Sequence, residues 1–188
     1  LRHPAENLTW YDGVEAANAL SKLKGLKPCY EISKDASGRP SGAKVTSESG
    51  SVYDCEGYRH ATEAELRYAA LAGSDVAYLS SLEQHLPRAI SSGGGRTYAV
   101  GTTKPNPWGF YNLIGNVWKW THDLWGDLPA GSAFSDPEGT ATGSERVLFG
   151  LSAKDGGDSS LSDVCSTAAD PGKCGRSIGV RLARSLVK

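Results

Sequence analysis

The pattern of apolar and polar residues along the chain predicts two amphipathic helices. Thr9 and Asp12 can form a capping box at the start of the first helix, whose apolar face continues until Gly25. A second capping box, Thr-Glu-Ala-Glu at 62–65, precedes another apolar face that ends at Gly73. We therefore expect two helices of ordinary globular length.

Between the helices the pattern changes to short extended pieces. The segments PCYEI at 28–32 and SVYDC at 51–55 flank the Gly-, Pro- and Ser-rich stretch SGRPSGA, which predicts a hairpin with a long loop. The alternation in IGVRLARS at 178–185 predicts a closing strand. From Gly73 to Pro107 there is little periodicity, and we expect mostly loop there with one short helix around 78–85.

Aromatic residues are concentrated in one segment, and charge is spread evenly. Residues 106–125 hold four of the five tryptophans, which favours a core role for most of them. The formal net charge of -1 argues against a nucleic-acid partner or a basic membrane patch. No apolar run approaches the roughly 20 residues that span a bilayer, so we expect no membrane span in this chain.

The four cysteines form two local couples, Cys29 with Cys55 and Cys165 with Cys174. An even number without CxxC spacing favours two structural disulfides over a metal site, and hence an extracytoplasmic compartment. Four reduced thiols in a cytosolic protein remain an alternative, because a domain of this size does not need disulfides.

Five spaced blocks carry a resemblance to a known family. They are LTWYDGVEAANAL at 8–20, GYRHATEAELRYAA at 57–70, NPWGFYNLIGNVWKW at 106–120, RVLFGLS at 146–152 and IGVRLAR at 178–184. Together they resemble the formylglycine-generating-enzyme, or sulfatase-modifying-factor, family. The resemblance implies an α+β, C-type-lectin-like fold with two helices, short antiparallel strands and long loops, formed as a single domain by residues 1–188.

The resemblance also allows the enzymatic chemistry of the family to be tested. Members that oxidise a substrate cysteine hold copper with a cysteine pair, and the matching positions here are Asp155 and Ser160. Neither side chain is a soft, redox-active ligand, so we expect no enzyme activity and no cofactor. A metal-dependent oxidase or oxygenase and a fixed structural scaffold domain remain alternatives.

Other candidate catalytic groups are scattered. A second enzymatic branch of the family uses a histidine-rich iron site, but the histidines here show no ligand spacing, and we expect His60 to lie on the surface. Four carboxylates could act as acid/base groups, but nothing in the sequence brings any two together beside a nucleophile, and they are interpreted as solvated loop charges: Asp54, Glu56, Asp123 and Asp127.

A calcium site of the family has a changed ligand in this chain. The resemblance places its ligands at Asn112, Gly115, Val117 and Lys119, where Lys119 replaces the charged glutamate. An ammonium among those oxygens would repel a divalent ion. We expect Lys119 to substitute structurally for the metal; the alternative is a lysine that points to solvent.

The family includes the variable proteins of diversity-generating retroelements, such as those of treponemes, whose rewritten stretch lies between the last two blocks. The resemblance implies a hypervariable ligand-binding region at about 149–180. Phe149 and Leu151 are expected as exposed apolar anchors within a mainly polar surround. The full expected ligand-binding set is Phe149, Leu151, Ala153, Lys154, Asp155, Asp158, Ser160, Asp163, Lys173, Arg176 and Val180. The expected partner is a protein or glycan on another cell, bound at the cell surface.

Overall fold

The computed structural model describes residues 2–74, 96–127, 135–155 and 166–186. The short helix expected around 78–85 lies outside these ranges. Both expected long helices are present, α1 from Trp10–Leu23 and α2 from Glu63–Leu71. Each begins with the predicted capping box, formed by Thr9 and Asp12 in α1 and by Thr62 and Glu65 in α2.

The predicted hairpin is present, but its second strand is not the predicted segment. β1 (Tyr30–Lys34) pairs antiparallel with β2 (Pro40–Val45), and residues 35–39 form the loop between them. The segment SVYDC instead contains a short 3-10 helix, Val52–Asp54, capped by Ser51. The Cys29–Cys55 disulfide is confirmed, and it joins the start of the hairpin to this helix rather than two paired strands.

A four-stranded sheet forms the centre of the molecule. Its order is β6 (Ser166–Ala169), β5 (Arg146–Phe149), β4 (Trp118–Leu124) and β7 (Ile178–Val180). Most of the described strand pairs are antiparallel as expected, whereas β4 pairs parallel with β7. The predicted closing strand is split in two, because β8 (Leu182–Arg184) leaves this sheet and pairs with β3 (Tyr58–His60).

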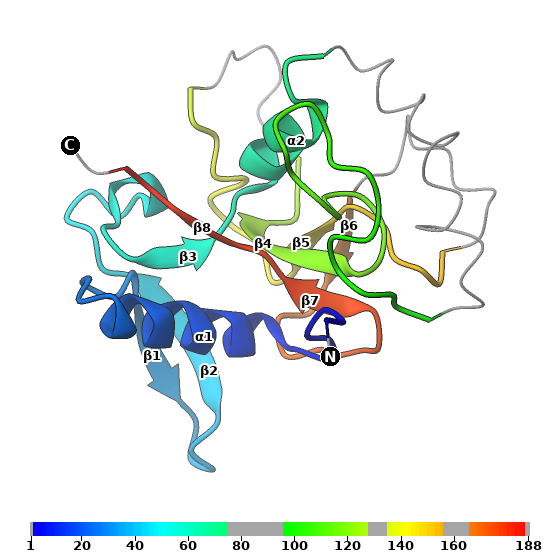
Figure 1. Cartoon of the computed structure of the whole chain (residues 1–188). Coiled ribbons are helices and arrows are strands. Elements are labelled where there is room, and N and C mark those ends of the chain that lie inside the picture. The colour runs from blue at the N-terminus through cyan, green and yellow to red at the C-terminus, as the bar shows by residue number, and fades with distance from the viewer. Residues whose placement is uncertain (1, 75–95, 128–134, 156–165, 187–188) are drawn as a thin grey trace.

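The sheet separates two hydrophobic cores. In Figure 1, α1 lies below the sheet and α2 above it. Leu148 and Trp120 pack on the α1 side with Trp10, whereas Phe149 packs on the α2 side with Leu66. Consecutive residues of β5 therefore enter opposite cores, as the alternation of side chains along a strand requires.

Candidate ligand-binding site

The expected variable stretch begins and ends at the same end of the four-stranded sheet. In the register of the sheet, Lys119 near the start of β4 lies opposite Phe149, the last residue of β5, and beside Gly179 of β7. Residues 150–155 thus leave the sheet where residues 175–177 return to it. This end of the sheet consists of residues 150–155, residues 175–177 and the segment 112–117 between them. We call it the loop end of the sheet.

Backbone hydrogen bonds hold the loop end together. Gly115 donates its N–H to the Gly150 carbonyl at 2.5 Å, and Ala153 donates to Asn116 at 3.1 Å. On the other flank, Trp118 donates to the Ser177 carbonyl at 2.7 Å. The segment that carries the expected calcium ligands therefore binds both flanks of the variable stretch.

Lys119 lies at the centre of the loop end and is 3% exposed. Its Nζ donates to the Gly115 carbonyl oxygen at a distance of 2.8 Å. This carbonyl oxygen is one of the expected calcium ligands. This contact overturns the alternative in which the lysine points to solvent. A Cβ at Gly150 would lie 3.3 Å from the Lys119 Nζ and 2.5 Å from the Leu113 carbonyl oxygen, so the close approach requires glycine.

The expected apolar anchors are not on the surface, and this part of the prediction is wrong. Phe149 is 0% exposed and belongs to the core beneath α2, where the Arg67 guanidinium lies 5.8 Å from its ring centroid. Leu151 belongs to the same core, and Ala153 is also buried. Phe149 is the last residue of β5, a strand that is covered on both faces. The chain then turns at Gly150, which has a positive φ of 96°, and Leu151 after it is buried.

Val180 is also misplaced in the prediction, because it is partly buried and packs against the core on the α1 side. A Cβ on Gly13 of α1 would come within 2.7 Å of the Val180 Cγ1. Val180 is therefore part of the scaffold between β7 and α1.

The basic residues of the predicted set are accessible. Lys154, Lys173 and Arg176 are exposed, and Asp155 is partly exposed. The Asp155 carboxylate accepts a hydrogen bond from the Ser152 N–H at 2.6 Å, which fixes the turn before Lys154. The remaining predicted residues, Asp158, Ser160 and Asp163, lie outside the described ranges.

The second expected cysteine couple is not described in full. Cys174 is exposed and makes no disulfide with a described residue, whereas Cys165 lies outside the described ranges. Their pairing stays a prediction.

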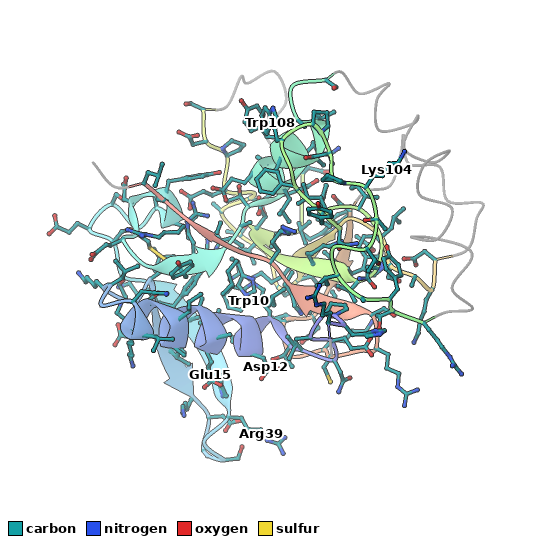
Figure 2. All side chains as sticks on the ribbon, viewed as in Figure 1. Trp10, Asp12, Glu15, Arg39, Lys104 and Trp108 are labelled. Atoms are coloured by element: carbon teal, nitrogen blue, oxygen red, sulfur yellow. A yellow bond between two sulfur atoms is a disulfide. The ribbon has the colours of Figure 1, made fainter. Side chains whose placement is uncertain are left out.

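Sequence reasoning missed a buried polar cluster on the α1 side. His60 was expected on the surface, but it is fully buried and stacks on Trp10 with ring centroids 5.2 Å apart (Figure 2 labels Trp10). Its Nε2 lies 3.0 Å from the Trp10 carbonyl oxygen. Burial lowers the pKa of His60 to about 4, so the ring is neutral at pH 7.

A second histidine lies in the same cluster. His122 Nδ1 lies 3.3 Å from the Tyr30 hydroxyl oxygen, and the Arg146 guanidinium donates to the His122 carbonyl. That guanidinium lies 4.1 Å from the Trp10 ring centroid. Burial, followed by the charge of Arg146, lowers the pKa of His122 to about 3. The cluster joins α1, β1 and β4 with neutral histidines.

One of the four acidic residues interpreted as solvated is buried. Asp54, Glu56 and Asp127 are exposed as expected, but Asp123 is 4% exposed. Its Oδ2 accepts a hydrogen bond from the Glu63 N–H at 2.7 Å, at the N-terminus of α2. The signal in the sequence is the alternation of Lys119, Thr121 and Asp123 along β4, which places all three on one buried face.

The family model described as "Sulfatase-modifying factor enzyme 1-like domain" matches residues 1–186. The chain belongs to this family.

Individual relatives of this family agree with the fold. Treponema denticola variable protein 1 superposes with a TM-score of 0.80 at 28% identity, over 97% of this chain and 71% of that one. The match confirms the expected α+β, C-type-lectin-like fold and the resemblance to a variable protein.

Two curated relatives match over shorter stretches. The Chaperone protein LppX of Paenibacillus barcinonensis is 32% identical over 62% of this chain and 50% of its own length. The formylglycine-generating enzyme of Streptomyces coelicolor is 35% identical over 50% of this chain and 35% of its own length. The chain therefore spans half or less of the length of these curated relatives.

The metals associated with this family do not fit the described residues. At the calcium position, the Lys119 ammonium already donates to the Gly115 carbonyl that the metal would need. At the first copper position, the Asp155 carboxylate is a hard ligand and is engaged by the Ser152 N–H. Within the described ranges, no three His, Cys, Asp or Glu side chains gather as a metal site. No described helix is long and apolar enough to cross a membrane.

Proposed function

We propose that this protein is a non-enzymatic ligand-binding module of the variable-protein type. One observation carries the proposal: the stretch between the last two family blocks starts and returns at one end of the sheet, on a frame held by Lys119 and backbone hydrogen bonds. The frame is held by these backbone hydrogen bonds and by the buried residues of the stretch, including Ala169 of β6, so its exposed positions can change without loss of the fold. The likeness to Treponema denticola variable protein 1 supports this assignment.

The buried residues narrow the proposed binding set. Phe149, Leu151, Ala153 and Val180 serve the scaffold, so diversification at these positions would damage the core. The proposed ligand-contacting residues are Lys154, Asp155, Asp158, Ser160, Asp163, Lys173 and Arg176. The proposed ligand is a protein or glycan on another cell.

The Cys29–Cys55 disulfide supports an oxidising, extracytoplasmic location. Display at the cell surface is part of the proposal and rests on the likeness to a variable protein. The same proposal treats residues 1–188 as one domain whose C-terminal region is diversified by a retroelement.

The proposal is tested by sequencing the 3′ end of the gene across a bacterial population. We expect variation at exposed codons between 154 and 176, copied from an adenine-rich template beside a reverse transcriptase gene. Codons 149, 151 and 153 should keep residues that fit the core. An invariant 3′ end with no template nearby would refute diversification.

The absence of enzyme activity is tested separately. The purified protein, supplied with copper and oxygen, should leave a cysteine-containing peptide unoxidised under conditions in which a formylglycine-generating enzyme converts it to an aldehyde. Stoichiometric copper binding together with aldehyde formation would overturn the non-enzymatic assignment.

A further inference from the structure

A second site candidate lies at the opposite end of β4, away from the loop end. A cleft of about 240 Å³ opens there between the end of β4, the N-terminal turn of α2 and residues 137–139. Its lining includes Asp123, Glu63, Arg67 and Trp125. None of its lining residues falls within 149–180. Two residues of the 149–180 stretch contact this lining: the Ser166 hydroxyl donates to the Glu63 Oε1 at 2.6 Å, and the Arg67 guanidinium lies over the buried Phe149 ring. Asp123 and Trp125 themselves lie outside the stretch.

The cleft contains the Asp123 carboxylate, which no described basic side chain approaches within ion-pair distance, although the Arg146 guanidinium interacts with it electrostatically and the Thr121 hydroxyl donates to it. Glu63 is paired with Arg67 at 2.7 Å, so these two charges compensate each other. Asp123 accepts the Glu63 N–H, but no described basic side chain forms an ion pair with it. Burial raises the pKa of Asp123 to about 6, so the carboxylate is still ionised at neutral pH. A buried anion of this kind is stabilised by a cation that enters the cleft.

An exposed aromatic side chain borders the same space. Trp125 lines the cleft and is 45% exposed, which leaves a large part of its surface uncovered. Tryptophan is the aromatic residue that attracts ammonium and guanidinium groups most strongly through its ring face. A carboxylate beside an accessible indole therefore favours a cationic ligand over an anionic or purely apolar one.

The third wall of the cleft is held in place before any ligand arrives. Glu138 is hydrogen-bonded to the Ser51 hydroxyl, and the Tyr53 hydroxyl donates to the Pro137 carbonyl at 3.0 Å. Gly139 has a φ of +82°, and a Cβ there would lie 2.8 Å from the Asp123 Cβ. Glycine thus allows this wall to approach Asp123 closely, and the fixed wall lowers the ordering cost of binding.

We propose that this cleft binds a basic side chain of a partner protein, with Asp123 as the counterion of the ammonium or guanidinium group and Trp125 as its aromatic contact. Asp123 and Trp125 belong to the scaffold and are distinct from the proposed ligand-contacting residues. Variants of the exposed loop positions that keep Ser166 of β6 would retain the same additional contact.

The test is an NMR titration of the ¹⁵N-labelled protein at neutral pH with Nα-acetyl-arginine methylamide and Nα-acetyl-lysine methylamide. Nα-acetyl-norleucine methylamide is the neutral control ligand. We expect a cationic probe to shift the Trp125 indole N–H and the Glu63 amide at millimolar concentration, with no such shift from the neutral probe. Equal shifts from the neutral and cationic probes, or none from any probe, would overturn the proposal.

Variants separate the two contacts. Asp123→Asn keeps an oxygen that can accept the Glu63 N–H but removes the charge, and we expect binding of the probe to weaken at least about tenfold. Trp125→Ala should weaken it by about three- to fivefold. Trp108→Ala is the matched control, because Trp108 (labelled in Figure 2) is equally exposed at 45% but does not line the cleft. Its ring instead contacts Tyr68.

The outcomes are distinguishable from failure of the main function. Unchanged binding in Asp123→Asn, or equal losses in Trp125→Ala and Trp108→Ala, would refute the cleft site even if the variable surface is real. If Asp123→Asn fails to fold, the comparison of Trp125→Ala with Trp108→Ala decides alone. If sequencing shows that the gene is not diversified, the result of the probe titration is unaffected.

Discussion

Each end of β4 contains a buried charged side chain that is hydrogen-bonded to the backbone, but the two side chains have different roles. At the loop end, Lys119 is a buried cation that donates to a backbone carbonyl. At the cleft end, Asp123 is a buried anion that accepts from a backbone N–H. Both side chains lie on the α2 face of the same strand, two pleats apart.

The difference lies in what surrounds each charge. The Lys119 ammonium lies between the Gly115 carbonyl, to which it donates, and Gly150, where the proposed variable stretch leaves the sheet, so this side chain stabilises the frame. Asp123 borders a cleft with an exposed tryptophan, so its charge is available to a ligand. A buried charge within backbone oxygens indicates a scaffold, whereas a buried charge beside a cavity indicates a site.

The largest expected effect is at Phe149. Phe149→Ala removes a fully buried ring from the core under α2 and should lower the free energy of unfolding by about 3–5 kcal/mol. Urea unfolding followed by circular dichroism measures the change. Lys154→Ala, five residues later and exposed, is the control and should change stability by less than about 0.5 kcal/mol. If Phe149→Ala lowers the free energy of unfolding by less than about 1 kcal/mol, the burial of this side chain is contradicted.

Acid should destabilise the protein through the two buried histidines on the α1 side of the sheet. His60 and His122 have pKa values lowered to about 4 and about 3, so the unfolded chain binds more protons below pH 6.5. Each should cost about 2 kcal/mol of stability at pH 5. Asp123 acts in the opposite direction, because its raised pKa of about 6 makes the native state bind more protons between about pH 6 and 4.

The free energy of unfolding should fall by about 2–3 kcal/mol between pH 8 and pH 5, as measured by urea unfolding at each pH. Asp123→Asn should deepen the loss by about 1 kcal/mol, and His60→Gln should reduce it by about 2 kcal/mol. Stability that rises on acidification through this window would contradict the burial of the histidines.

Substitutions of Lys119 should have the next largest effect on the free energy of unfolding. Lys119→Met leaves the Gly115 carbonyl without this donor and should cost about 1–3 kcal/mol. Lys119→Glu should be destabilised without calcium and regain thermal stability when calcium is added, because it supplies the missing carboxylate ligand. Lys154→Glu is the control and should not respond to calcium. Calcium stabilisation of the unmodified protein would contradict the role of the lysine.

The smallest expected effect on stability comes from the exposed basic residues. Lys154→Ala, Lys173→Ala and Arg176→Ala should each change the free energy of unfolding by less than about 0.5 kcal/mol. Thermal unfolding of the three single variants measures this. A loss above about 2 kcal/mol in any of them would place that residue in the scaffold and remove it from the proposed binding set.

Local patterns in the sequence predicted more than long-range ones. Both capping boxes identified their helices, since the signal lies within four residues. The second hairpin strand was missed because Pro40 and Gly42 disfavour a strand by propensity, yet pairing with β1 forms one. His60 and Phe149 were misplaced because their partners, Trp10 and Leu66, lie far away in sequence. A residue's burial depends on such partners, which no local window contains.

A scan of single substitutions across residues 146–180, with protease resistance of the displayed protein as the readout, tests the central claim most directly. The account predicts that Phe149, Leu151 and Ala153 accept only residues that fit the core, whereas Lys154, Lys173 and Arg176 accept most residues. Equal tolerance at both sets, or stricter limits at the exposed basic positions, would contradict a fixed frame that carries a replaceable surface.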